Sequence, residues 1–109
     1  GYDEISLTSG FKFFTKNGEQ IINPEDFGQK RIQQSEIFGG DSVADAAKIF
    51  KTILDGKGTE AQNNVVLTNA AFALKIVDDA LSFNDAFEKA KQSLFNKKAK
   101  ECLNNLVSL

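Results

Sequence analysis

Two adjacent carboxylates, Asp3 and Glu4, are the first side chains of this 109-residue chain that could do chemistry. Neighbouring residues of a strand point to opposite faces, but at a strand end or in a loop both carboxylates can turn toward one ion. Mg²⁺ prefers hard oxygen ligands of this kind and keeps several of its waters. The pair is therefore a candidate magnesium site, although an acidic dipeptide near a chain end is more often only solvated.

Three further features could bind a ligand or serve the fold. Gly39-Gly40-Asp41 precedes an expected helix, where glycines can present free N–H groups to a phosphate. Asp41 would place a carboxylate where that anion binds, and Ser42 can occupy the cap, so we interpret the segment as a structural turn.

Asn69 lies in an apolar stretch, where its amide needs hydrogen-bonding partners. We expect it to bind the backbone of a loop rather than a ligand. Glu25 and Asp26, beside Pro24, could cap a turn or pair with Lys30 or Arg31.

The composition excludes several classes of function. The chain has no histidine, which removes Ser-His and Cys-His catalysis and His-containing zinc sites. Its one cysteine, Cys102, cannot form an internal disulfide, fits a reducing compartment, and lies on an apolar helical face where we expect it to be buried. A net charge of −2 argues against binding of nucleic acid or an anionic membrane. No run approaches the roughly 18 apolar residues of a membrane span.

The first forty residues are expected to position these groups with β-structure. Ile5–Thr8 alternates as a strand does. Residues 11–15 and 19–23 are rich in β-forming residues and flank Asn17-Gly18, which predicts a hairpin with positive φ at both turn residues. Pro24 opens a turn over residues 24–28, and residues 29–40 are expected to be irregular.

Four helices with short connections account for the remainder. Ser42, Thr59 with Gln62, and Ser82 are the expected caps of the first three, and the fourth begins near Lys97. The stripes expected to be buried are Val43, Ala46, Ala47, Phe50, Ile53 and Leu54 in the first helix, Phe83, Ala86, Phe87, Ala90 and Leu94 in the third, and Ala99, Cys102, Leu103 and Leu106 in the fourth. The predicted fold class is α+β, an N-terminal β-strand and β-hairpin followed by about four α-helices.

The second of these helices contains Asn63–Val77, which is apolar around almost its whole circumference. Only Asn64, Thr68 and Lys75 form a polar strip. A helix of this kind is normally covered on more than one side. Within this chain, we expect the cover to come from the phenylalanines of the hairpin or from a second copy.

Several landmarks together resemble the anthranilate phosphoribosyltransferase family. Gly1-Tyr2-Asp3-Glu4-Ile5-Ser6 is similar to its G-x-D-E-[LIV]-S segment, Asn23–Gly28 to T-P-E-D-F-G, and Phe38–Asp41 to its GGD turn. Ile53–Gly56 is similar to I-L-x-G, and Leu67–Ala71 to L-x-N-A-A. The order and spacing hold across essentially the whole chain. The departures are Asp45, Thr68, Phe72, Ala86 and Lys97, of which the last two replace glycines common in the family.

The resemblance implies that residues 1–109 are the C-terminal part of an α/β catalytic domain of the phosphoribosyltransferase and nucleoside phosphorylase fold. The N-terminal helical domain and the first part of the α/β domain would then be absent. The intact enzyme would transfer the phosphoribosyl group of phosphoribosyl pyrophosphate (PRPP) to anthranilate, releasing pyrophosphate, in tryptophan biosynthesis. It would be a cytoplasmic homodimer. Asp3 and Glu4 would hold Mg²⁺, and no catalytic or substrate-binding residue would lie in this chain, which alone would be inactive and could associate non-natively.

Two other interpretations remain open at the level of sequence. The chain could be a self-contained, non-catalytic helical interaction domain with an exposed apolar surface as its partner site. It could also belong to a phosphoribosyltransferase or pyrimidine nucleoside phosphorylase of the same fold, because the residues that select the acceptor are not in this chain.

Overall fold

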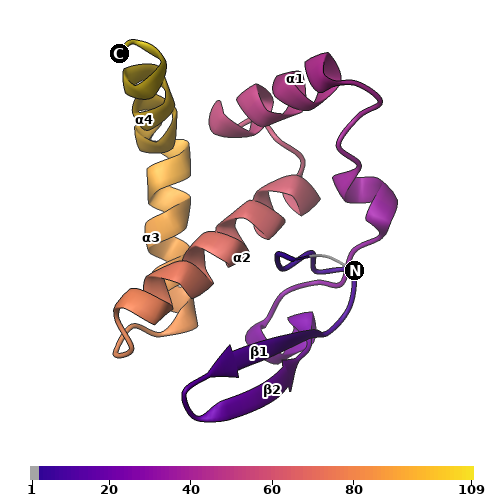
Figure 1. Ribbon diagram of the computed structural model, residues 1–109, viewed down its shortest axis with the longest axis vertical. Coiled ribbons are helices and arrows are strands. Elements are labelled where there is room, and N and C mark those ends of the chain that lie inside the picture. The colour runs from indigo at the N-terminus through magenta and orange to yellow at the C-terminus, as the bar shows by residue number, and fades with distance from the viewer. Residues whose placement is uncertain (1–2) are drawn as a thin grey trace.

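A computed structural model describes residues 3–109, so Gly1 and Tyr2 of the family-like segment lie outside the described residues. The described elements are the strands β1 (Phe11–Thr15) and β2 (Gly18–Ile22), 3-10 turns at Pro24–Phe27 and Gln34–Ile37, and the helices α1 (Val43–Leu54), α2 (Glu60–Val77), α3 (Phe83–Phe95) and α4 (Lys98–Val107). Figure 1 shows α2 crossing the middle of the molecule, with the hairpin on one side and α3 on the other. The predicted α+β class, with a hairpin followed by four helices, is confirmed.

The predicted strand at Ile5–Thr8 is wrong, because these residues form a bent loop. Leu7 has a φ of 64°, a left-handed conformation that interrupts an extended chain. The Thr8 N–H donates to the Ser6 hydroxyl at 3.3 Å, which replaces a bond to a neighbouring strand. Leu7 is fully buried against Ile32, so the alternation reflects burial in a core and not membership of a sheet.

The predicted hairpin is confirmed, but its turn residues differ. Thr15 pairs with Gly18, so Lys16 and Asn17 make the turn. Gly18 has a φ of 117°, whereas Asn17 is not among the residues with positive φ in the described part of the chain. The Asn17 N–H donates to the Thr15 hydroxyl at 3.1 Å. Gly18 therefore absorbs the unusual backbone conformation alone, which glycine can do without steric cost.

The expected helix starts are confirmed by their caps. The Ser42 hydroxyl accepts a hydrogen bond from the N–H of Asp45 at 3.1 Å at the start of α1. Thr59 and Gln62 form a reciprocal capping box before α2, and the Ser82 hydroxyl accepts from an N–H three residues later. Each hydroxyl satisfies an N–H group that has no partner within its helix. These local bonds fix where the helices begin.

Helix α2 packs against two separate apolar groups. Ala61 joins a cluster with Leu7 and Ile32, and Leu67 joins a cluster with Ala90 and Leu94 of α3. Thr68, which the sequence places in a polar strip, is completely buried. Thr68 follows Ala61 and precedes Phe72 at helical spacing, so it shares the face that the N-terminal loop and the hairpin cover. The expected cover of α2 by hairpin phenylalanines is confirmed, since Phe11 and Phe13 contact Phe72.

The faces of α1 and α4 that were expected to be buried are not. Every residue of α1 is exposed or half-buried, with Val43 88% and Phe50 52% exposed. In α4, Leu106 is exposed and Cys102 is exposed rather than buried, while Ala99 and Leu103 are half-buried. Figure 1 shows the N-terminal part of α1 away from the helices that follow, whereas Ile53 and Leu54 at its C-terminal end pack against the cluster of Leu67, Ala90 and Leu94. The apolar stripes exist, but within residues 3–109 too little packs against them to bury them.

Across the described range, none of the helices combines the length and the apolar character that crossing a membrane requires.

Candidate functional site

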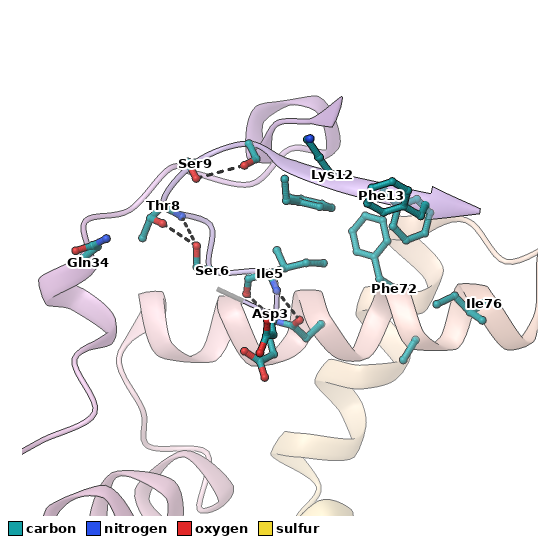
Figure 2. Close-up of a pocket in the computed structure, with 16 residues that line it drawn as sticks. Asp3, Ile5, Ser6, Thr8, Ser9, Lys12, Phe13, Gln34, Phe72 and Ile76 are labelled. Atoms are coloured by element: carbon teal, nitrogen blue, oxygen red, sulfur yellow. Dashed lines mark hydrogen bonds between the residues drawn. The ribbon is translucent and has the colours of Figure 1, made fainter. Parts of the chain in front are cut away.

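A cavity of about 830 Å³ lies between the N-terminal loop, β1 and α2, and both predicted metal ligands line it. Figure 2 shows Ser6, Thr8 and Ser9 on one side of this cavity and Phe13, Phe72 and Ile76 on the other, with Asp3 between them beside α2. The cavity therefore has a side rich in hydroxyls, an aromatic side, and carboxylates at its edge.

The acidic pair is available to a ligand. Asp3 and Glu4 are both exposed, and within residues 3–109 neither carboxylate accepts a hydrogen bond or forms an ion pair. No group of three or more metal-ligating side chains occurs in that range, so the pair is an open edge and not a closed cage. Mg²⁺ is often bound through one or two carboxylates, with waters and substrate oxygens completing its shell. The two residues fit magnesium on these terms.

The segment that carries the acidic pair is attached to α2 through Asn69. The Asn69 Oδ1 accepts a hydrogen bond from the Ile5 N–H at 3.0 Å, and its Nδ2 donates to the Ile5 carbonyl at 2.7 Å. Nδ2 also donates to the carbonyl of Val65 at 2.8 Å, one turn earlier in the same helix. The expectation that Asn69 binds a loop backbone is confirmed.

A turn of hydroxyl residues beside the acidic pair was not recognised from the sequence. Ser6 and Thr8 share a hydrogen bond of 2.7 Å between their hydroxyls, and Ser9 Oγ donates to the Gly10 carbonyl at 3.3 Å. All three side chains line the cavity. The available signal was three hydroxyl residues within five positions of Glu4, but the strand interpretation put only Ser6 and Thr8 on a common face and left Ser9 outside the strand.

The Gly39-Gly40-Asp41 segment is a structural turn and is not part of the cavity. Gly40 has a φ of 88°, and a Cβ at this position would lie 2.6 Å from the Cβ of Asp45. Ser42 occupies the cap of α1. These contacts favour the structural interpretation over a phosphate site.

Glu25 and Asp26 also have structural bonds, as the sequence suggested. The Arg31 guanidinium binds Glu25 through two nitrogens, with Nη2 at 2.8 Å from Oε1, and this hydrogen bonding holds the pKa of Glu25 below its ordinary value. The Asp26 carboxylate accepts a hydrogen bond from the Asn23 N–H at 2.8 Å. Neither acid lines the cavity, so Asp3 and Glu4 are the only carboxylates among its lining residues in the described range.

Comparison with known proteins gives the class of protein first. Residues 1–100 match the family described as "Glycosyl transferase family, a/b domain". The chain therefore belongs to this glycosyl transferase family.

The names of individual relatives are more specific than the description of the family. The chain is 49% identical to an anthranilate phosphoribosyltransferase of Flavobacterium johnsoniae over 109 residues. It is 48% identical to the enzyme of the same name from Flavobacterium psychrophilum and 44% identical to that from Bacteroides fragilis strain YCH46. Each alignment covers all of this chain and 33% of the relative, so the chain spans about a third of the length of the proteins it matches. The resemblance stated from the sequence motifs is confirmed.

Proposed function

We propose that this chain is part of an anthranilate phosphoribosyltransferase and forms one edge of its magnesium site. The observation that carries this proposal is the placement of Asp3 and Glu4, unpaired within residues 3–109, on a cavity lined with hydroxyls. The relatives at 39–49% identity bear that enzyme name. The complete protein would transfer the phosphoribosyl group of PRPP to anthranilate and release pyrophosphate.

The residues of this chain would bind and orient, and would not supply a nucleophile. Asp3 and Glu4 would hold Mg²⁺ directly or through its waters. The hydroxyls of Ser6 and Thr8, two and four residues beyond Glu4, would orient those waters. When bound, magnesium neutralises charge on a phosphate-type leaving group. The aromatic side of the cavity, with Phe13 and Phe72, would keep water away from one flank of the site.

Residues 1–109 would form the C-terminal part of the α/β domain, and the rest of that domain would cover the exposed face of α1. Val43 and Phe50 are apolar residues of this face, and the relatives are about three times as long as this chain. Hydrogen exchange of the α1 amides tests this arrangement. We expect slow exchange in a full-length chimera and fast exchange in the 109-residue chain, and equal rates would contradict it.

A chimera tests the activity. We would replace the matching third of the Flavobacterium johnsoniae relative with this chain and measure the loss of anthranilate fluorescence with PRPP and Mg²⁺ present. We expect the chimera to be active and the 109-residue chain alone to be inactive. In the chimera, the double change Asp3→Asn and Glu4→Gln should lower the rate at least a hundredfold, an order of magnitude typical of lost electrostatic stabilisation.

Two outcomes would overturn the proposal. A folded, inactive chimera would favour a paralogue with another acceptor, and near-normal rates in the double variant would remove the role of the acidic pair. Matched changes at Asp79 and Glu88, to Asn and Gln, control for loss of negative charge away from the cavity, because both carboxylates are exposed and neither forms an ion pair within the described residues. We further expect the full-length protein to be a cytoplasmic homodimer, which fractionation and the mass of the chimera in solution would test.

A further inference from the structure

We propose that Asn69 is a positioning residue, which fixes the acidic pair relative to α2. This inference rests on the proposed function for the assignment of a metal to Asp3 and Glu4. Asn69 touches neither carboxylate, and it would act through the backbone of Ile5, the residue directly after Glu4.

We call the two hydrogen bonds between the Asn69 side chain and the Ile5 backbone the Asn69 clamp. One side-chain amide binds both polar groups of a single residue, accepting from the Ile5 N–H at 3.0 Å and donating to the Ile5 carbonyl at 2.7 Å. Two bonds to one residue restrict its rotation as well as its distance, as a neighbouring strand would. The third bond, from Nδ2 to the Val65 carbonyl at 2.8 Å, fixes the orientation of the amide on its own helix. The side chain thus has one arrangement that satisfies all three bonds.

The carboxylates have no other anchor among residues 3–109. Neither Asp3 nor Glu4 makes a side-chain hydrogen bond or ion pair in that range, so their positions follow from the backbone that carries them. The next attachment along the chain is Leu7, whose carbonyl accepts a hydrogen bond from the Ile32 N–H at 3.0 Å. Leu7 is three residues beyond Glu4, whereas Ile5 is adjacent to it. The clamp is therefore the contact best placed to set the acidic pair.

The clamp also couples the two sides of the cavity. Asn69 and Phe72 are three residues apart on α2, so they lie on the same side of the helix. Asn69 holds the acidic segment, and Phe72 contacts the rings of Phe11 and Phe13 on β1. One rigid helix thereby sets the distance between the carboxylates and the aromatic side of the cavity. A metal position set only by a segment without an attachment to α2 would lack this relationship.

Substitutions can separate positioning from general stability. Asn69→Leu keeps a similar volume and removes all three bonds. Asn64→Leu is the matched control, because Asn64 lies on the same helix and makes no side-chain hydrogen bond within residues 3–109. Leu67→Ala destabilises the opposite face of α2, where Leu67 is 3% exposed, without touching the clamp.

The experiment uses nuclear magnetic resonance of the 109-residue chain with Mn²⁺ as the probe, together with hydrogen exchange of the Ile5 amide. In the wild-type chain, we expect Mn²⁺ to broaden the signals of residues 3–5. We also expect it to broaden the α2 signals around Asn69, by an amount that decreases with their distance from the ion. The Ile5 amide should exchange slowly. In Asn69→Leu, broadening at residues 3–5 should persist while the ordered pattern along α2 and the protection of Ile5 are lost. Both controls should keep the pattern and the protection.

The results distinguish failure of the clamp from failure of the metal assignment. An unchanged pattern and an unchanged Ile5 exchange rate in Asn69→Leu would overturn the positioning role, as would an equal loss in Leu67→Ala. Absence of broadening at residues 3–5 in both the wild-type chain and the full-length chimera, or its survival after Asp3→Asn with Glu4→Gln, would overturn the proposed metal function. In that case, the Ile5 exchange rates alone decide the clamp: loss of protection in Asn69→Leu supports it, and retained protection refutes it.

Discussion

The ring of Phe72 on α2 meets the ring of Phe13 on β1 edge to face, with centroids 5.4 Å apart and planes at 62°. The ring of Phe11 approaches the same residue at 5.7 Å and 89°. An isolated two-stranded hairpin is marginally stable in water. These contacts therefore attach the hairpin to the helix that also carries Asn69, and they give the cavity its aromatic side.

Replacing Phe72 with alanine should detach the hairpin. Phe72 is 8% exposed, and removal of a buried phenylalanine ring lowers the free energy of unfolding by about 3 kcal/mol or more. Urea unfolding measures this loss, and hydrogen exchange should show faster exchange across β1 and β2. Phe14→Ala is the control, because Phe14 is 67% exposed and should change stability by no more than about 0.5 kcal/mol. Hairpin amides that stay protected in Phe72→Ala would refute the attachment.

Replacing Thr68 with valine should stabilise the chain. The Thr68 hydroxyl is buried and has no hydrogen-bond partner within residues 3–109, and valine has nearly the same shape without the polar group. A buried, unpaired polar group costs about 1–3 kcal/mol, so we expect the free energy of unfolding to rise by about 1 kcal/mol. Thr52→Val gives the contrast, because the Thr52 hydroxyl donates to the Lys48 carbonyl at 2.8 Å. A gain of the same size in Thr52→Val would show that burial of the hydroxyl is not the cause.

Replacing Lys97 with glycine should also stabilise the chain. Lys97 has a φ of 66° at the start of α4, a conformation that costs a residue other than glycine roughly 1–2 kcal/mol. The change also removes the bond from Lys97 Nζ to the Asp55 carbonyl, which is exposed. We expect a net rise of up to about 1 kcal/mol in the free energy of unfolding, measured by urea or heat. The neighbouring Lys98→Gly lies at a position with helical φ and should give no gain.

Stability should fall in acid because two of the three ion pairs within residues 3–109 lower the pKa of their carboxyl group. The Lys100 ammonium donates a hydrogen bond to Asp55 and holds the pKa of that carboxyl below its ordinary value, as Arg31 does for the pKa of Glu25. The unfolded chain then binds these protons more tightly than the folded chain does. The pairs stabilise the fold above the ordinary carboxyl pKa of about 4, and the stabilisation is lost as the pH falls through the lower folded-state pKa.

Urea midpoints measured from neutral pH down to about pH 3 test this dependence. Asp55→Asn and Glu25→Gln should each make the midpoint less sensitive to pH over the acidic part of that range. Glu88→Gln removes an exposed carboxylate without an ion pair within the described residues and should leave the slope unchanged. Equal slopes in all three variants would mean that the two pairs do not contribute.

Features that depend on neighbours in sequence could be predicted without the structure. Ser42, Thr59 and Ser82 fixed helix starts because a cap bonds to residues only three positions away. The hairpin followed from β-forming runs around a glycine turn, although the exact turn residues depended on the backbone of Asn17. The need of Asn69 for partners could also be predicted, because an amide in an apolar helix must be satisfied.

Features that depend on what lies opposite a residue could not be predicted in this way. The same helical spacing that identified a buried stripe in α3 identified stripes in α1 and α4 that are largely exposed. For this reason, Cys102 was expected to be buried and is exposed, and the position of Thr68 in a polar strip did not reveal that it is buried. Periodicity tells which residues share a face, but not whether another element covers that face.

The sequence by itself determined the hairpin and the four helices of this protein, its family resemblance and the candidate metal ligands Asp3 and Glu4. Only the tertiary structure placed that pair on a cavity between hydroxyls and phenylalanines, and only it showed that Asn69 holds the adjacent backbone. The physical reason is the distance along the chain: caps and turns join residues a few positions apart, whereas the contact between Ile5 and Asn69 spans 64 positions and forms only when the loop packs on α2.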